Sequence, residues 1–214
     1  MRNLLNYDGP VLRFLTKIVY SAWLNILWFI CCLPIFTIGA STTALCYCCQ
    51  KIARDEEGYI TKSFFSSFKN DFKKSTIIGL ITTVLGICLS IDAYVMYHLC
   101  LTNIFWTLLT AVLIIAIIAY IIILLWIFPL HARFENTVAN TFKNAIMLGM
   151  HFLICTATMA GIYVIMAWVI YYFCTPLIIL GVGTCALLNA MLMKNILIQC
   201  EDRDNEYERN KQNI

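Results

Sequence analysis

One acidic side chain lies within a long apolar segment of the sequence, Asp92 in LSIDAYVMYH (89–98). A carboxylate in a bilayer costs about 2.5–3.5 kcal/mol on insertion scales, and such residues tend to face a bundle interior or a water-filled cavity. The amides of Asn25 and Asn189 also stand in apolar segments. Asp92, Asn25 and Asn189 therefore form a candidate intramembrane site for a proton or a solute. The alternative is an acid protonated or hydrogen-bonded near the outer interface, with the amides bonding between helices.

Cysteine and histidine are the other residue types that could do chemistry here. Cys46 and Cys49 form a C-x-x-C on one helix face, which is a metal or redox pattern. The sequence has no second C-x-x-C, and His98, His131 and His151 stand near the ends of apolar segments. We therefore predict no metal site and no cofactor. The cysteines are expected to act as small apolar residues and the histidines to lie at the membrane interface.

The sequence contains no motif of a catalytic or nucleotide-binding site. It lacks a glycine-rich loop with lysine, a G-x-S-x-G and an H-E-x-x-H. Its basic segments are small and lack the aromatic spacing of nucleic-acid binding proteins. We predict neither an enzyme nor a nucleic-acid partner, and we interpret the basic segments as signals for topology and lipid.

The composition defines the elements that must position these residues. Of the 214 residues, 61% are hydrophobic and 13% are charged, and the mean hydropathy is +0.80. Soluble domains are about 45–50% apolar and about 25% charged, so the chain is expected to be a single integral membrane domain over 1–214. Lys and Arg gather in four segments: 2–17, 51–74, 133–143 and 194–211. The apolar stretches between them are 18–50, 75–132 and 144–193.

The second and third apolar stretches each predict two membrane helices. A crossing needs about 20 apolar residues, so the second stretch divides at LCLTNIF (99–105). The third divides at FCTPL (173–177), where Pro176 ends a helix. Because basic residues stay cytoplasmic, the basic segments and the polar tail 195–214 are expected inside.

The first stretch predicts a short hairpin rather than one crossing. The segment before it is also basic, so an even number of crossings keeps both flanks inside. Gly39 is expected to supply the turn conformation, and Ser41 or Thr42 to cap the second helix. Each arm has about 14–16 apolar residues, or about 21–24 Å of helix, so the hairpin either crosses a thinned bilayer or is re-entrant. The turn residues are Pro34, Thr37, Gly39, Ser41 and Thr42. Thr37 is expected to face the outside or an outward-facing pocket.

These observations predict an all-α fold, a polytopic transmembrane bundle of about six helices. Amphipathic helices at 60–74 and 134–146 are expected on the cytoplasmic side. The protein is expected in the plasma membrane of a bacterial cell, with both termini in the cytoplasm. The expected membrane helices are 18–33, 41–54 (ended by Gly58), 75–98, 105–128, 150–173 and 177–194.

The two amphipathic segments carry apolar stripes. In 60–74, Ile60, Phe64, Phe68 and Phe72 recur every four residues, opposite the lysines. We expect this helix to lie flat on the inner leaflet, with its rings in the acyl boundary. SFKN (67–70) matches TFKN (141–144). The match indicates either an internal repeat or two unrelated cytoplasmic segments that are both suited to the membrane interface.

Three blocks of sequence resemble the YesL family. They are LNILWFICCLPIFTIGASTTAL (24–45), ARDEEGY (53–59) with FFSSFKNDFKKS (64–75), and FPLHARFENTVANTFKNA (128–145). The resemblance implies a bacterial multi-pass membrane protein with a domain of unknown function. Members of the family are often encoded near carbohydrate import systems of the ATP-binding-cassette type. The family implies no catalytic residues, and the cysteines around Tyr47 depart from its pattern.

Our leading hypothesis is a non-enzymatic accessory protein that lies in the lipid bilayer and binds a membrane transport protein, such as an ATP-binding-cassette permease for sugars. The alternative is a small transporter or channel, with a site between the broken hairpin 31–49 and Asp92. The oligomeric state is left open. The candidate cytoplasmic docking or lipid face comprises Arg54, Glu56, Glu57, Lys62, Lys69, Lys73, Arg133 and Glu135.

Overall fold

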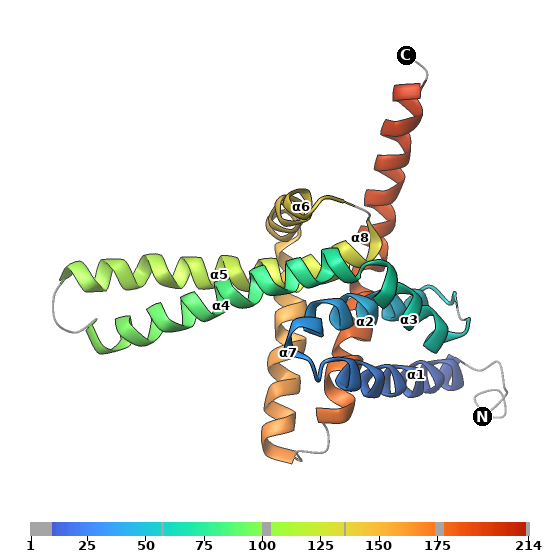
Figure 1. Cartoon of the computed structure of the whole chain (residues 1–214), viewed down its shortest axis with the longest axis horizontal. Coiled ribbons are helices and arrows are strands. Elements are labelled where there is room, and N and C mark those ends of the chain that lie inside the picture. Colours follow the sequence, from blue (N-terminus) through green and yellow to red (C-terminus); the bar gives the residue numbers. More distant parts are fainter. Residues whose placement is uncertain (1–9, 57, 100–103, 135, 174–177, 213–214) are drawn as a thin grey trace.

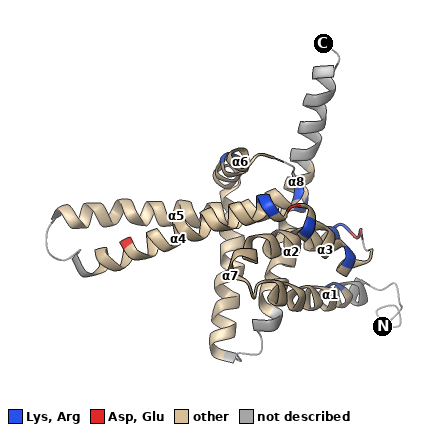
Figure 2. Cartoon of the chain, in the orientation of Figure 1, with Lys and Arg blue, Asp and Glu red and all other residues tan. Residues whose placement is uncertain are grey.

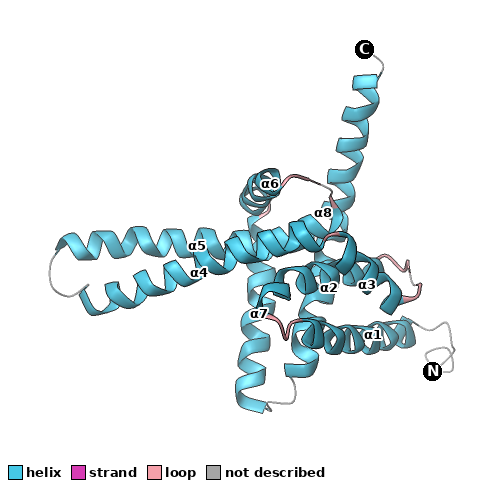
Figure 3. Cartoon of the chain, in the orientation of Figure 1, coloured by secondary structure: helices cyan, strands magenta, loops and turns pink. Residues whose placement is uncertain are grey.

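The structure, a computed structural model, describes residues 10–56, 58–99, 104–134, 136–173 and 178–212. These residues form eight α-helices and one short 3-10 helix, and none of them lies in a strand (Figure 3). The prediction of an all-α fold is confirmed. The helices are α1 (Pro10–Cys31), η1 (Ile35–Thr37), α2 (Ile38–Ala53), α3 (Ile60–Asn70), α4 (Phe72–Leu99), α5 (Ile104–Arg133), α6 (Val138–His151), α7 (Leu153–Phe173) and α8 (Ile178–Gln212).

Four helices are long and apolar enough to cross a membrane. Their apolar spans are Phe72–Tyr97, Phe105–Arg133, Leu153–Tyr172 and Gly181–Ile198, in α4, α5, α7 and α8. The apolar part of α1, Leu15–Cys31, is shorter, and α2 has 16 residues. The chain is therefore a multi-pass membrane protein by its four long helices. Crossing by the short pair α1 and α2 stays a prediction.

Helix α2 lies at the centre of the molecule. It packs against α1, α3, α4, α5 and α8, and eleven of its residues are buried. Figure 1 shows two hairpins leaving this centre, α4 with α5 in one direction and α7 with α8 crosswise to it. The broken, hydroxyl-rich stretch of the sequence thus starts the helix against which five other helices pack.

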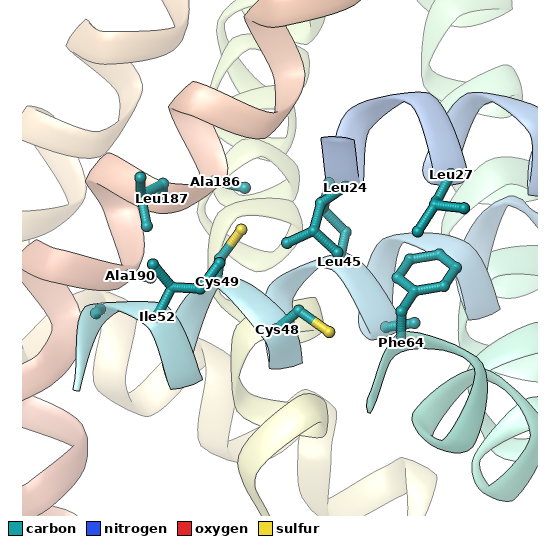
Figure 4. Close-up of a cluster of buried hydrophobic side chains, with 12 residues drawn as sticks. Leu24, Leu27, Leu45, Cys48, Cys49, Ile52, Phe64, Ala186, Leu187 and Ala190 are labelled. Carbon is teal, nitrogen blue, oxygen red and sulfur yellow. The ribbon is translucent and has the colours of Figure 1, made fainter. Parts of the chain in front are cut away.

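Two clusters of buried side chains hold these helices together. The first joins α1, α2, α3 and α8, and Cys48 and Cys49 lie inside it with Leu24, Leu45 and Phe64 (Figure 4). Cysteine packs here as a small apolar residue. The second joins α4, α5, α6, α7 and α8 around fully buried Trp126, Ile127, Ile78, Met193 and Leu197.

The turn before α2 differs from the sequence-based expectation. Gly39 lies within α2, and no described glycine has a positive φ. Gly39 instead allows close contact with α4, since a Cβ on it would lie 2.8 Å from Gly79 Cα. Neither Ser41 nor Thr42 caps the helix, because the N-cap residue is Thr37, which makes no side-chain cap bond.

The hydroxyls of this stretch bond to nearby carbonyls instead. Thr42 Oγ1 donates to the Ile38 carbonyl at 2.7 Å, one turn back in the same helix. Thr37 is buried, and its Oγ1 lies 2.6 Å from both the Cys31 and Pro34 carbonyls. Thr37 therefore closes the turn between α1 and α2 by satisfying carbonyl groups that the helix end leaves free.

Helix α2 ends at Ala53, and Asp55 rather than Gly58 takes the left-handed position after it. Asp55 has φ 62°, in the left-handed region, and is the only described non-glycine residue with positive φ. The Glu56 amide donates to the Lys51 carbonyl at 3.1 Å, which closes the helix as in a Schellman motif. Asp55 Oδ1 also pairs with Lys17 Nζ of α1 at 2.7 Å. Asp is one of the few side chains that tolerate this conformation.

Helix boundaries also differ from the predicted ones. The amphipathic helix breaks at Asp71, so α4 already begins at Phe72, and α6 runs on to His151. Helix α5 continues through Pro129 to Arg133. At the proline, Gln50 Nε2 of α2 donates to the Pro129 carbonyl at 2.8 Å. Helix α8 extends through the expected polar tail.

The phenylalanine stripe of α3 faces protein more than lipid. Phe64 is fully buried in the first core cluster, and Phe68 is partly buried against it. Phe65 is 48% exposed. The expectation that these rings all lie in the acyl boundary is therefore wrong for Phe64. Protein interior and lipid are equally apolar, so the stripe alone does not distinguish them.

Candidate functional sites

The three predicted intramembrane polar residues lie in different places. Asn25 is buried between α1 and α8, where a Cβ on Gly183 would lie 3.0 Å from Asn25 Cβ. Asn189 is also buried and lines a cavity of about 40 Å³ with Tyr163. A cavity of this size holds about one water molecule. The two amides therefore lie at helix–helix contacts.

Asp92 is exposed on α4 and lies apart from both amides. Helix α4 contacts α2 of the α1–α2 hairpin at Gly79. Asp92 lies thirteen positions further along α4, or about 20 Å of helix. Within the described part of the chain, Asp92 makes no hydrogen bond or ion pair. The structure does not bring Asp92, Asn25 and Asn189 into one site.

A basic pocket lies where α2, α3, α4 and α5 meet. Its volume is about 480 Å³, within the range of about 300–1,000 Å³ typical of ligand sites. Four helices each contribute one basic side chain, and Asp71 is the one acid among the described lining residues. Figure 2 shows basic residues in this region and none along the outer parts of α4 and α5. The basic side chains are Lys51, Lys62, Lys74 and Arg133.

Neutral donors complete the lining of the basic pocket. Tyr59, Ser63, Ser66 and Asn70 bring hydroxyl and amide groups from α3 and the segment before it. His131 of α5 also lines it and is 5% exposed. Neither ring nitrogen of His131 has a hydrogen-bond partner among the described residues. Buried ring nitrogens usually have one, so the pocket holds unused hydrogen-bonding capacity.

An apolar groove adjoins the basic pocket. Its volume is about 850 Å³, and Tyr59 and Lys62 line both the groove and the pocket. Its other walls are mostly apolar side chains of α1 and α3, among them Val19, Trp23 and Phe65. Trp23 Nε1 donates to Thr61 Oγ1 at 3.1 Å, which links the two walls.

The predicted cytoplasmic face divides between different surfaces. Lys62 and Arg133 line the basic pocket. Lys69 and Lys73 line another groove with Phe65, Phe68 and Phe72, which adjoins the basic pocket at Asn70, Asp71 and Lys74. Arg54 is half-buried at the end of α2, and Glu56 is exposed. Glu57 and Glu135 lie outside the described residues.

Sequence reasoning did not assign Lys51, Lys74 or His131 to a site. These residues are spread over eighty positions, and only the packing of α2, α4 and α5 brings them together. One local signal was available. Tyr47 and Lys51 are four residues apart on α2, and Lys51 Nζ lies 5.5 Å from the Tyr47 ring centroid, which is a cation–π contact.

The fold defines a helical multi-pass membrane protein with a basic pocket at one end of its central helix. Residues 21–93 match a family described as "Protein of unknown function, DUF624". That segment contains the turn between α1 and α2, together with Lys51, Lys62 and Lys74.

Two Bacillus subtilis (strain 168) proteins are similar to this chain. "Uncharacterized protein YteU" is 22% identical over 205 residues, covering 94% of this chain and 91% of that protein. "Uncharacterized protein YesV" is 29% identical over 136 residues, covering 62% of this chain and 64% of that protein. No solved structure matches. The comparisons thus indicate bacterial relatives whose own functions are not described.

Proposed function

We propose that this chain is a member of the YesL family and a non-enzymatic accessory subunit of the bacterial plasma membrane. Its partner is a permease of the ATP-binding-cassette type, in a system for carbohydrate import. The helices α1 and α2 cross as a short hairpin, so that six helices span the bilayer and both termini are cytoplasmic. The hairpin of α4 and α5 is the part that binds the permease.

The observation that carries this proposal is the exposed carboxylate of Asp92 on an uncovered hairpin. Of the 18 most apolar consecutive residues in each helix, only 11% are buried inside the chain in α4 and only 6% in α5. An acid that faces lipid costs about 2.5–3.5 kcal/mol at the centre of a membrane helix on insertion scales, and Asp92 meets part of this cost about two turns from the end of α4. A permease helix that presents a hydrogen-bond donor or a basic side chain to Asp92 removes this cost. Binding of another membrane protein therefore accounts for an acid on this surface.

The transporter alternative has less support. It requires Asp92 beside the broken hairpin, but about 20 Å of helix separates Asp92 from the contact of α4 with the hairpin at Gly79. The cavity around Asn189 has a volume of about 40 Å³, which is too small for a sugar.

Site-specific photocrosslinking in native membranes tests the accessory function. A photoreactive residue at Val95, one turn from Asp92 and exposed, is expected to capture a permease subunit that mass spectrometry identifies. The matched control is Ile154 of α7, which is also exposed in an apolar helix. Asp92→Ala is expected to weaken co-purification of that subunit by about tenfold, as for loss of a charge-assisted hydrogen bond.

Two outcomes would contradict the accessory function. One is that Val95 captures lipid or a second copy of this chain and no permease subunit. The other is that Asp92→Ala leaves the recovery of the captured permease unchanged.

A further inference from the structure

We propose that the basic pocket and the apolar groove beside it form one binding site for an anionic phospholipid of the inner leaflet. The phosphate occupies the basic pocket and an acyl chain lies in the apolar groove. The site lies where α4 begins and α5 ends, away from Asp92 on the outer part of α4, and does not depend on the permease. It assigns a ligand to residues that the packing of four helices brings together.

The charge of the basic pocket selects an anion. Lys51, Lys62, Lys74 and Arg133 approach it from four different helices, and Asp71 is the single described acid among them. Phosphate oxygens accept charge-assisted hydrogen bonds from Lys and Arg. The ammonium groups of Lys51, Lys62 and Lys74 around one pocket repel one another, so an anion between them stabilises the arrangement of the helices.

His131 supplies a second, independent sign of a ligand. Its ring is 5% exposed, it lines the basic pocket, and both of its nitrogens are without a partner in the described part of the protein. Leaving such groups unpaired costs about 1–3 kcal/mol for each group. A phosphate oxygen accepts from an N–H of His131, either directly or through a water, and so removes this cost for one of the two nitrogens.

The apolar groove identifies the phosphate as part of a lipid. The groove and the pocket adjoin at Tyr59 and Lys62, which line both. Val19 is 65% exposed and Trp23 is 50% exposed on the wall of the groove. A soluble phosphate ester would leave this wall uncovered, whereas an acyl chain covers it. Lys62 can extend its methylene groups along the groove and place its ammonium in the pocket.

Lipid binding to the purified full-length protein in detergent tests the site. Phosphatidylglycerol is titrated and the bound fraction is measured by native mass spectrometry, beside phosphatidylcholine with the same acyl chains. Glycerol phosphate and inorganic phosphate, which lack chains, provide the soluble arm. We expect phosphatidylglycerol to bind about tenfold more tightly than phosphatidylcholine, because both carry a phosphate but the lysines of the basic pocket repel the choline cation.

Matched variants localise the binding. Lys51→Gln/Lys62→Gln is expected to weaken phosphatidylglycerol binding by about tenfold or more. The control Lys69→Gln/Lys143→Gln removes the same charge from two exposed lysines outside the basic pocket and is expected to bind as the unmodified protein does. Because Lys62 is exposed, Lys62→Gln alone keeps the test valid if the double variant does not fold.

Phe65→Ser separates a lipid from a soluble phosphate. Phe65 lines the groove and not the pocket, so this change is expected to weaken phosphatidylglycerol binding several-fold. Three results would overturn the proposal. They are equal losses in the pocket and control variants, binding of inorganic or glycerol phosphate as tight as that of phosphatidylglycerol, and binding of phosphatidylglycerol unaffected by Phe65→Ser.

Discussion

Gly39 of α2 and Gly79 of α4 pack backbone against backbone. A Cβ on Gly79 would lie 2.7 Å from Gly39 Cα and 3.0 Å from its nitrogen. Rigid backbone atoms, and no flexible side chain, therefore occupy the space at this crossing. Ser75, one turn before Gly79, is fully buried, and its carbonyl also lies against Gly39. Small residues therefore lie on α4 at this crossing, as is common where membrane helices cross.

Gly79→Ala is expected to destabilise the protein by about 1–3 kcal/mol, because the two helices must separate to admit the methyl group. The measurement is thermal unfolding in detergent. Gly161→Ala of α7 is the matched control, since a Cβ there meets nothing within 4 Å. Equal unfolding temperatures for the two variants would show that the crossing of α2 and α4 is looser than described.

Phe64 and Phe65 are adjacent in sequence but differ in environment. Phe64→Ala is expected to cost about 3–5 kcal/mol, as for large core residues, because the ring is fully buried. Phe65→Ala should cost much less, since that ring is about half exposed. The same unfolding assay compares them, and a similar loss for both would mean that α3 lies on lipid rather than on α1 and α2.

Trp126 links α5 to α7 through a buried hydrogen bond. Trp126 Nε1 donates to Thr156 Oγ1 at 2.9 Å, so Trp126→Phe is expected to lose about 0.5–1.5 kcal/mol of stability in addition to the packing change. Trp168→Phe is the control, because Trp168 is 61% exposed. The bond can be isolated by a double-mutant cycle with Thr156→Val; a coupling energy near zero would contradict it.

The left-handed backbone at Asp55 predicts an order among substitutions. Asp55→Gly loses the ion pair with Lys17 but relieves the backbone, so stability should change little. Asp55→Val loses the ion pair and also meets a left-handed penalty of about 1–2 kcal/mol. Unfolding of both variants at low and high salt checks this order. A valine variant as stable as the glycine variant would show that the backbone at Asp55 is not left-handed.

Much of the fold follows from the sequence because apolar runs and breaks act locally. The long helices α4, α5 and α7 coincide with the stretches expected to cross the membrane, and Pro34 marks the break before α2. The role of Gly39 could not be predicted, since glycine serves both turns and close helix contacts. Only the second use leaves it inside a helix.

The candidate sites were predicted less well, and the reason is long-range packing. Asp92 was identified from its apolar neighbours, but its distance from Asn25 and Asn189 depends on the direction in which α4 leaves the centre. The basic pocket joins Lys51 to Arg133 through helix contacts that are distant in sequence. Lys62 and Arg133 were among the predicted basic residues, while His131 reads as an ordinary interface residue until its burial is seen.

The central position of α2 has a consequence for synthesis of the protein. Helix α2 emerges early, yet it packs against α8, as shown by Cys49 Sγ, which lies 4.0 Å from the Gly183 carbonyl 134 residues later. With 16 residues and several buried hydroxyls, α2 is a weak candidate for independent insertion. Until α8 is synthesised, α2 lacks one of the helices that it packs against. Its exposed face must therefore contact the insertion machinery in the meantime. A helix made more than a hundred residues later therefore completes the enclosure of α2.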